Sequence, residues 1–359
     1  MLESRTGLRT RFRPGLSLAH RLATNWLLTD PNYVLGTDTA PLRNYQVQNF
    51  TDMRVWYLCG GRLRTVKQRP LNVMVAVLMV ASAVLFFVFE APWTWHHISP
   101  AVPLVFAYLW FLTFAFFVKA ATVDPGIQPR NLHVPLNVSN LVHANGPEEY
   151  FNTVSLPYHM DKINGVSVKY CATCHIWRAP RTSHCAVCNS CVLCHDHHCI
   201  FLNNCVGYRN YRYFLWFLLT SVTLCVYLAT FAFIHCFRFR YEKNSHVASF
   251  KESISDSPVL LLLGLIGCIG SVYPMMLLIF HIFLTANNLT TREYLNYVRP
   301  LLDSDDRYIN VFDKKSVVQN LWLAWFATPQ GVSYLRPKDA YVEGDFSKEG
   351  LPQLRSFDG

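Results

Sequence analysis

Four long stretches of the chain are almost purely apolar, and the segments between them carry most of the charged residues. A helix that rises 1.5 Å per residue needs roughly 20 apolar residues to cross about 30 Å of hydrocarbon. The hydrophobic pattern therefore predicts an all-α polytopic membrane protein with four transmembrane helices. These helices are expected at residues 71–89, 101–118, 213–237 and 259–286.

The composition supports this prediction. Of the 359 residues, 52% are hydrophobic and 15% are charged, whereas an ordinary soluble domain has roughly 25% charged residues. Such a composition also excludes a chain dominated by disorder, which requires low hydrophobicity and high charge. Four buried helices of a soluble core are the competing interpretation, and four runs of this length together disfavour it.

The lysines and arginines predict the orientation in the membrane. Cytosolic loops are enriched in these residues, and three segments hold 28 of the 32, whereas the connector between the first two helices has none. The excess of nine positive charges thus faces membrane lipids rather than nucleic acid. The predicted division is a cytosolic segment 1–70, transmembrane helices 1 and 2 in 71–118, a cytosolic cysteine-rich domain 119–212, transmembrane helices 3 and 4 in 213–286, and a cytosolic segment 287–359.

Eight of the twelve cysteines fall within residues 171–205, where the pattern C-x2-C-x9-H-x6-C occurs twice with an offset of 14 residues. Three thiolates and one imidazole form a ligand set typical of a closed, tetrahedral structural zinc site. Disulfides are disfavoured on a reducing cytosolic face, and an iron–sulfur cluster would normally use four cysteines. The pattern predicts two structural Zn²⁺ ions, one held by Cys171, Cys174, His184 and Cys191, and the other by Cys185, Cys188, His198 and Cys205.

The repeat leaves Cys199, His197 and Asp196 without a metal to bind. A cysteine beside a histidine and an acid has the parts of an activated nucleophile, since the imidazole can take the thiol proton and the carboxylate can orient the imidazole. A polar surface turn and additional metal ligands are the alternatives that the residues alone leave open.

Residues 171–207 resemble the cysteine-rich domain of the DHHC family of protein S-acyltransferases. The similarity includes the paired cysteines, the Asp-His-His-Cys run and the Asn-Asn-Cys-Val-Gly run that ends the segment. Further family motifs match outside it, although an Asp-Pro-Gly sequence is also a common turn and Thr-x-x-Glu also fits a helix capping box. The matching residues are Asp124, Pro125 and Gly126 after the second helix, Thr290, Thr291 and Glu293 after the fourth, and Asn320 in a C-terminal element.

The resemblance implies a two-step transfer of a long-chain acyl group from palmitoyl-CoA to Cys199 and then to a cysteine of a protein substrate. Arg178 and Arg181 are the expected contacts of the CoA phosphates. Residues 60–67 and His195 are most similar to fungal Ras palmitoyltransferases, which implies Ras-like acceptors, a small accessory subunit and the endoplasmic reticulum membrane, with the Golgi as the alternative. A non-catalytic, zinc-dependent membrane adaptor is the competing function.

Overall fold

The structure is a computed structural model of the whole chain. It describes residues 28–29, 54–67, 70–131, 133, 151–154, 166–240, 249–301, 309–330 and 333–335. Most of the predicted N-terminal segment, and residues 336–359 of the predicted C-terminal segment, lie outside the described residues.

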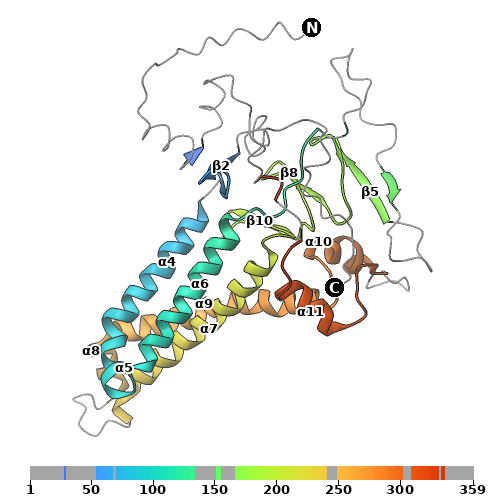
Figure 1. Cartoon of the computed structure of the whole chain (residues 1–359). Helices are drawn as coiled ribbons and strands as arrows, with labels where there is room; N and C mark the ends of the chain where they lie inside the picture. Colours follow the sequence, from blue (N-terminus) through green and yellow to red (C-terminus); the bar gives the residue numbers. More distant parts are fainter. Residues whose placement is uncertain are drawn as a thin grey trace, which may run out of the picture.

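Four helical segments have the length and apolar composition to cross a membrane, which confirms the predicted number. They lie side by side in one bundle, with the short strands and helices α10 and α11 at one end (Figure 1). The three later spans are α6 (Ala101–Thr122), α7 (Tyr211–Cys236) and α9 (Pro258–Ala286), each within four residues of the expected bounds.

The first span is longer than the apolar pattern predicts. It comprises α4 (Leu71–Leu85), a π-helical turn (Phe86–Glu90) and α5 (Ala91–His97), so the residues expected to form a connector are helical. The buried Glu90 carboxylate lies 2.9 Å from Nδ1 of His235 on α7, and the Trp93 ring stacks on the same histidine at 3.9 Å. Polar side chains thus extend the helix because α7 supplies their partners.

Glycines allow α9 to approach α7 closely. A Cβ atom added at Gly267 would lie 2.6 Å from the carbonyl oxygen of Cys225, and one added at Gly264 would lie 2.9 Å from the Phe233 ring. By contrast, bulky apolar side chains of α4 such as Val77 and Leu78 point outward and are each 60% exposed. An apolar outer face of this kind is what a lipid-embedded bundle requires.

The cysteine-rich region adds short antiparallel hairpins to the otherwise helical fold. Strand β5 (Val166–Cys171) pairs with β4 (Phe151–Val154) and β6 (Ile176–Trp177). Strands β7 (Ser183–Cys185) and β8 (Ser190–Val192) form a second hairpin, and β9 (His197–Cys199) and β10 (Asn204–Val206) form a third. Another hairpin precedes the first span, where β2 (Val55–Leu58) pairs with β3 (Leu63–Val66) and with β1 (Leu28–Thr29).

The remaining helices are short. A 3-10 turn (Arg238–Arg240) and α8 (Phe250–Asp256) connect α7 to α9, at the end of the bundle opposite the strands (Figure 1). After α9 follow α10 (Thr291–Glu293), a π-helical turn (Tyr294–Val298), a 3-10 turn (Arg299–Leu301) and α11 (Val317–Trp325). The segments after α9 therefore lie at the same end of the bundle as the cysteine-rich hairpins.

Candidate active site and metal centres

The two predicted sets of metal ligands form two separate clusters. In each cluster the four ligand atoms lie within 4.8 Å of one another. Nδ1 of His184 lies 3.4 to 3.9 Å from the sulfur atoms of its three cysteines, and Nδ1 of His198 lies 3.4 to 3.7 Å from those of the second set. Zinc bond lengths in a tetrahedral site place sulfur and nitrogen ligands about 3.5 Å apart, so both sets fit one metal ion each.

The spacing of the repeat explains this geometry. The final histidine and cysteine of each set lie directly opposite each other across a hairpin, His184 with Cys191 and His198 with Cys205. Of the six intervening residues, the first and last are one more strand pair, and the four between them form the turn that brings the ligands together. The first Cys-x2-Cys pair lies at a tight turn between β5 and β6. The same arrangement of a Cys-x2-Cys turn and a following hairpin therefore occurs twice, with an offset of 14 residues.

Asp196 and His197 lie together at the start of the β9–β10 hairpin. The Nδ1 atom of His197 is 2.6 Å from Oδ2 of Asp196, whose side chain is almost completely buried. Burial opposes ionisation of this carboxylate, but the contact with His197 lowers its pKa to about 2. Burial also opposes the charged form of His197 and acts to lower its pKa. The hydrogen bond to Asp196 outweighs burial, and the pKa is raised to about 10. The pair is therefore arranged to hold a protonated imidazole beside a carboxylate.

The Cys199 thiol lies on the same hairpin and faces the His197 ring. Burial acts to raise the pKa of this thiol, whereas the hydrogen bond and the positive charge of His197 lower it below its usual value. A thiol with a lowered pKa is a better nucleophile at neutral pH because more of it is thiolate. The acid, the histidine and the cysteine therefore form one connected row.

Residues 166–298 match the family model described as DHHC palmitoyltransferase. Palmitoyltransferase ERF2 of Debaryomyces hansenii is 48% identical over 351 residues, which cover 96% of this chain and 95% of that protein. Palmitoyltransferase ERF2 of Saccharomyces cerevisiae is 37% identical over 84% of this chain and 82% of its own length. Palmitoyltransferase erf2 of Emericella nidulans is 40% identical over 80% of this chain, but this match covers 47% of that protein.

The chain belongs to the DHHC palmitoyltransferase family. It is accordingly an acyltransferase, a protein palmitoyltransferase with a multi-pass membrane fold. The adaptor without catalytic activity is not supported, since the curated relatives that align along most of the chain are palmitoyltransferases.

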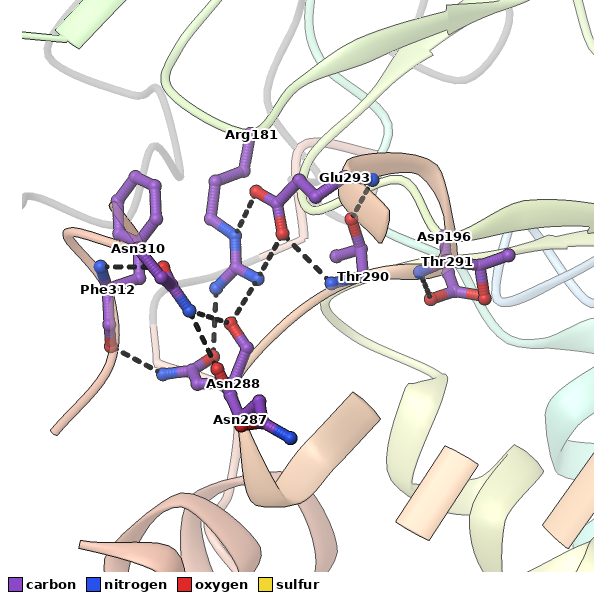
Figure 2. Close-up of polar contacts among 9 residues, drawn as sticks. All are labelled: Arg181, Asp196, Asn287, Asn288, Thr290, Thr291, Glu293, Asn310 and Phe312. Carbon is purple, nitrogen blue, oxygen red and sulfur yellow. Dashed lines mark hydrogen bonds and ion pairs between the residues drawn. The ribbon is translucent and has the colours of Figure 1, made fainter. Parts of the chain in front are cut away.

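The Thr-Thr-x-Glu motif of this family links the end of α9 to the cysteine-rich region. Thr290 and Glu293 form the capping box of α10. In the sequence, such a box was the alternative to a family motif. Thr291, which follows Thr290, donates two hydrogen bonds to Asp196 (Figure 2). Its backbone N–H donates to one carboxylate oxygen and its hydroxyl to the other. The motif thus fixes the acid that contacts His197.

Arg181 also contacts the segment that follows α9. The sequence predicted that this arginine contacts CoA. Its guanidinium donates to both carboxylate oxygens of Glu293, at 2.7 and 2.8 Å, and also to the Asn288 side chain and backbone (Figure 2). It also stacks over the Phe312 ring at 4.7 Å. In this structure Arg181 therefore links the turn before β7 to the segments that follow α9. Arg178 is half-buried directly after β6, and its role remains a prediction.

The other two family motifs also terminate elements. The Asp124 carboxylate accepts hydrogen bonds from the backbone of Gly126 and Ile127, so the Asp-Pro-Gly motif is a side-chain-stabilised turn after α6. Asn320 is buried on α11 and donates to the carbonyl of Ala286, the last residue of α9. The first motif therefore fixes the turn that follows α6, and Asn320 fixes α11 against the end of α9.

His281 was not predicted to belong to this site. It lies on α9 with 1% of its surface exposed, its Nδ1 is 2.9 Å from the Tyr211 hydroxyl, and its ring centroid is 6.1 Å from that of His197. With Asp196 and His197 it forms a third group whose ligand atoms lie within 4.8 Å. The Asp196 carboxylate is already occupied by His197 and Thr291, so we interpret the group as hydrogen-bonded. The sequence did carry one signal for His281, because a histidine is unusual within an otherwise apolar membrane span.

Proposed function

We propose that this chain transfers a long-chain acyl group from acyl-CoA to Cys199 and then to a cysteine of a protein substrate. The observation that carries the proposal is the row of Asp196, His197 and Cys199, in which the carboxylate lies 2.6 Å from the imidazole and the imidazole faces the thiol. Thioester exchange suits this arrangement because both the attacking and the leaving group are thiolates.

In the resting pair His197 already holds the proton of the Cys199 thiol, and in the first step the Cys199 thiolate attacks the carbonyl carbon of the acyl-CoA thioester. The carbon–sulfur bond to CoA then breaks, and His197 returns the proton to the departing CoA thiolate. Asp196 holds the imidazole in the required tautomer and stabilises its positive form. In the second step His197 takes the proton of the substrate thiol, and the resulting thiolate attacks the acyl carbon on Cys199. The carbon–sulfur bond to Cys199 breaks, so Cys199 leaves as a thiolate beside the protonated His197.

The two metal clusters are proposed to hold structural Zn²⁺. Zinc supplies a rigid tetrahedral support when bound, because three cysteines and one histidine per ion fill all four positions. In the second set, Cys185 and Cys188 lie on the β7–β8 hairpin, and His198 and Cys205 lie on the β9–β10 hairpin that carries the nucleophile. Its function is to position Cys199 and His197, while the chemistry belongs to the protein side chains.

The acyl chain is proposed to lie among the transmembrane helices, where each buried methylene contributes about 0.8 kcal/mol. Arg178 and Arg181 are proposed to contact the CoA phosphates, and Arg181 also binds Glu293 and Asn288. Palmitoyl-CoA is the expected donor on the basis of the family.

The finer biological assignments rest on the resemblance to the fungal enzymes. We propose Ras-like protein substrates, a small accessory subunit and residence in the endoplasmic reticulum membrane, with the Golgi as the alternative. The basic residues support cytosolic termini and a cytosolic cysteine-rich domain, so the nucleophile would meet its protein substrates on that side.

Labelling with radioactive or alkyne-tagged acyl-CoA tests the proposal. Purified full-length protein should acquire a hydroxylamine-labile label, and the Cys199→Ser and Cys199→Ala variants should not. An equal label in both variants would show that another residue is the nucleophile. Cys194→Ala provides the matched control, since this cysteine belongs to the same region but lies outside the proposed row.

A further inference from the structure

Arg64 is a charged residue buried in the hairpin that precedes the first membrane span. It lies on β3, and 1% of its surface is exposed. Its three guanidinium nitrogens have no hydrogen-bond partner within the part of the chain that the structure describes. Burying a guanidinium in this way is unfavourable unless an opposite charge lies near it. Arg62, two residues earlier on the same hairpin, is exposed, so the burial is specific to Arg64.

The acidic groups around Arg64 identify the opposite charge. Those that act on it electrostatically are Cys188, Tyr57, Cys205 and Asp124. The phenol of Tyr57 is neutral at neutral pH, and the Asp124 carboxylate already has a cationic partner in Arg209, whose Nε lies 3.9 Å away. The two cysteines both belong to the second metal centre. Thiolates of that centre are therefore the charges available to balance the guanidinium.

The hairpin is also fixed against the second centre by direct contacts. Arg54 donates to the carbonyl of Ala186, between the two cysteines of the Cys-x2-Cys turn. Asn203, in the turn before Cys205, donates its side-chain amide to the carbonyl of Val66 over 2.6 Å. The apolar side chains of the hairpin and the thiols of the centre share one buried cluster that includes Val55, Tyr57, Val66, Cys185, Cys188 and Cys205.

The charge of a filled site completes the argument. One Zn²⁺ ion with three thiolates and one neutral imidazole has a net charge of −1, and that charge would be buried here. We propose that Arg64 is the counter-charge of the second metal centre and stabilises zinc in it. This inference rests on the proposed zinc binding and is independent of the acyl-transfer steps.

The first centre provides an internal comparison. Its buried cluster consists of Cys171, Cys174, Ile176 and Cys191 and includes no residue of the β2–β3 hairpin. Loss of Arg64 should therefore weaken zinc in the second centre and leave the first one filled. Because β9 and β10 carry ligands of the second centre on either side of Cys199, that centre is also the one that supports the nucleophile.

The test compares full-length protein in detergent with its Arg64→Met, Arg64→Lys and Arg62→Met variants. Bound zinc is measured by mass spectrometry, and its release is followed with a chromogenic chelator. Alkylation of individual cysteines, resolved by peptide mass spectrometry, reports which centre has opened. We expect Arg64→Met to weaken zinc binding roughly 10- to 100-fold at the second centre only. Arg64→Lys keeps the charge and should lose less, and Arg62→Met should match the wild type.

Several results would overturn the inference. If Arg64→Met releases zinc from both centres at the same rate as the wild type, the charge of Arg64 does not act on the metal. Equal loss from both centres, in Arg64→Met and Arg64→Lys alike, would show that Arg64 supports the fold as a whole. A wild-type protein with far fewer than two zinc ions per chain would contradict the zinc assignment itself, and this outcome is distinguishable because it does not depend on any variant.

Discussion

Thr291 holds the Asp196 carboxylate from both sides: its backbone N–H donates to Oδ1 and its hydroxyl to Oδ2, each over 2.7 Å. The two residues are 95 positions apart in the sequence. Thr291 directly follows the N-cap of α10, so the position of the acid depends on how α9 ends. The orientation of His197 is therefore coupled to the packing of the fourth membrane span against the cysteine-rich region.

We expect Thr291→Val to slow the formation of the acyl-enzyme roughly tenfold, because a hydrogen bond to a charged group contributes about 1.5 kcal/mol or more. The measurement is the single-turnover labelling rate with acyl-CoA. Thr291→Ser keeps the hydroxyl and should react at nearly the wild-type rate. If the valine and serine variants react equally fast, the hydroxyl does not position the acid.

The ion pair between Arg181 and Glu293 should contribute to stability. Both side chains are largely buried, at 13% and 10% exposure, and removing one partner leaves an uncompensated charge. Arg181→Met should therefore lower the stability by about 3 kcal/mol, seen as a lower apparent Tm in detergent. The exposed neighbour of Glu293 provides the control, and Arg292→Met should leave the Tm unchanged. Equal Tm values for the two variants would contradict a stabilising pair.

Cys199 should stay reactive at a pH where an ordinary thiol is not. The protonated His197 lowers the pKa of this thiol, so the thiolate persists below the usual value and is lost as the pH falls through the lowered one. In His197→Gln the thiol loses the hydrogen bond and the positive charge that oppose the effect of burial, so its pKa should rise. Alkylation of Cys199 at pH 7.5 should then fall roughly tenfold or more, since one pKa unit changes the thiolate fraction tenfold. Cys59, half-exposed on the β2–β3 turn, is the internal reference.

The metal ligands could be predicted from the sequence, but their surroundings could not. The two ligand sets come from spacings of at most nine residues, and such spacings have the same geometry wherever the motif occurs. The contacts of Arg181 with Glu293 and of Glu90 with His235 join residues more than 100 positions apart. They depend on how the helices pack, so the sequence predicted neither contact and placed the end of the first span too early.

The two metal centres should differ in their effect on catalysis. Cys191→Ser and Cys205→Ser should each reduce bound zinc from two ions to one, measured by mass spectrometry. Cys205 lies opposite His198 on the hairpin of the nucleophile, so Cys205→Ser should reduce acyl-enzyme formation to the level of Cys199→Ala. Cys191→Ser should retain more of it. Retention of both zinc ions in either variant would contradict the assignment of that ligand.

Gly207 should not tolerate a side chain, because three segments meet at this position. An added Cβ atom would lie 2.7 Å from the carbonyl oxygen of Pro125, 2.7 Å from Cγ1 of Val192 and 3.0 Å from the carbonyl oxygen of Leu193. Two of these atoms belong to backbone that cannot yield easily, since the N–H of Leu193 donates to the carbonyl of Gly126.

Gly207→Ala should consequently push the Asp-Pro-Gly turn away from β8 and lower the stability by about 1–3 kcal/mol, the usual range for overpacking. The apparent Tm in detergent measures this effect. Gly270→Ala is the matched control, because its Cβ atom would contact only the Cys225 sulfur, at an ordinary 3.5 Å. A Tm for Gly207→Ala equal to that of the control would show that the turn and β8 can separate without loss of stability.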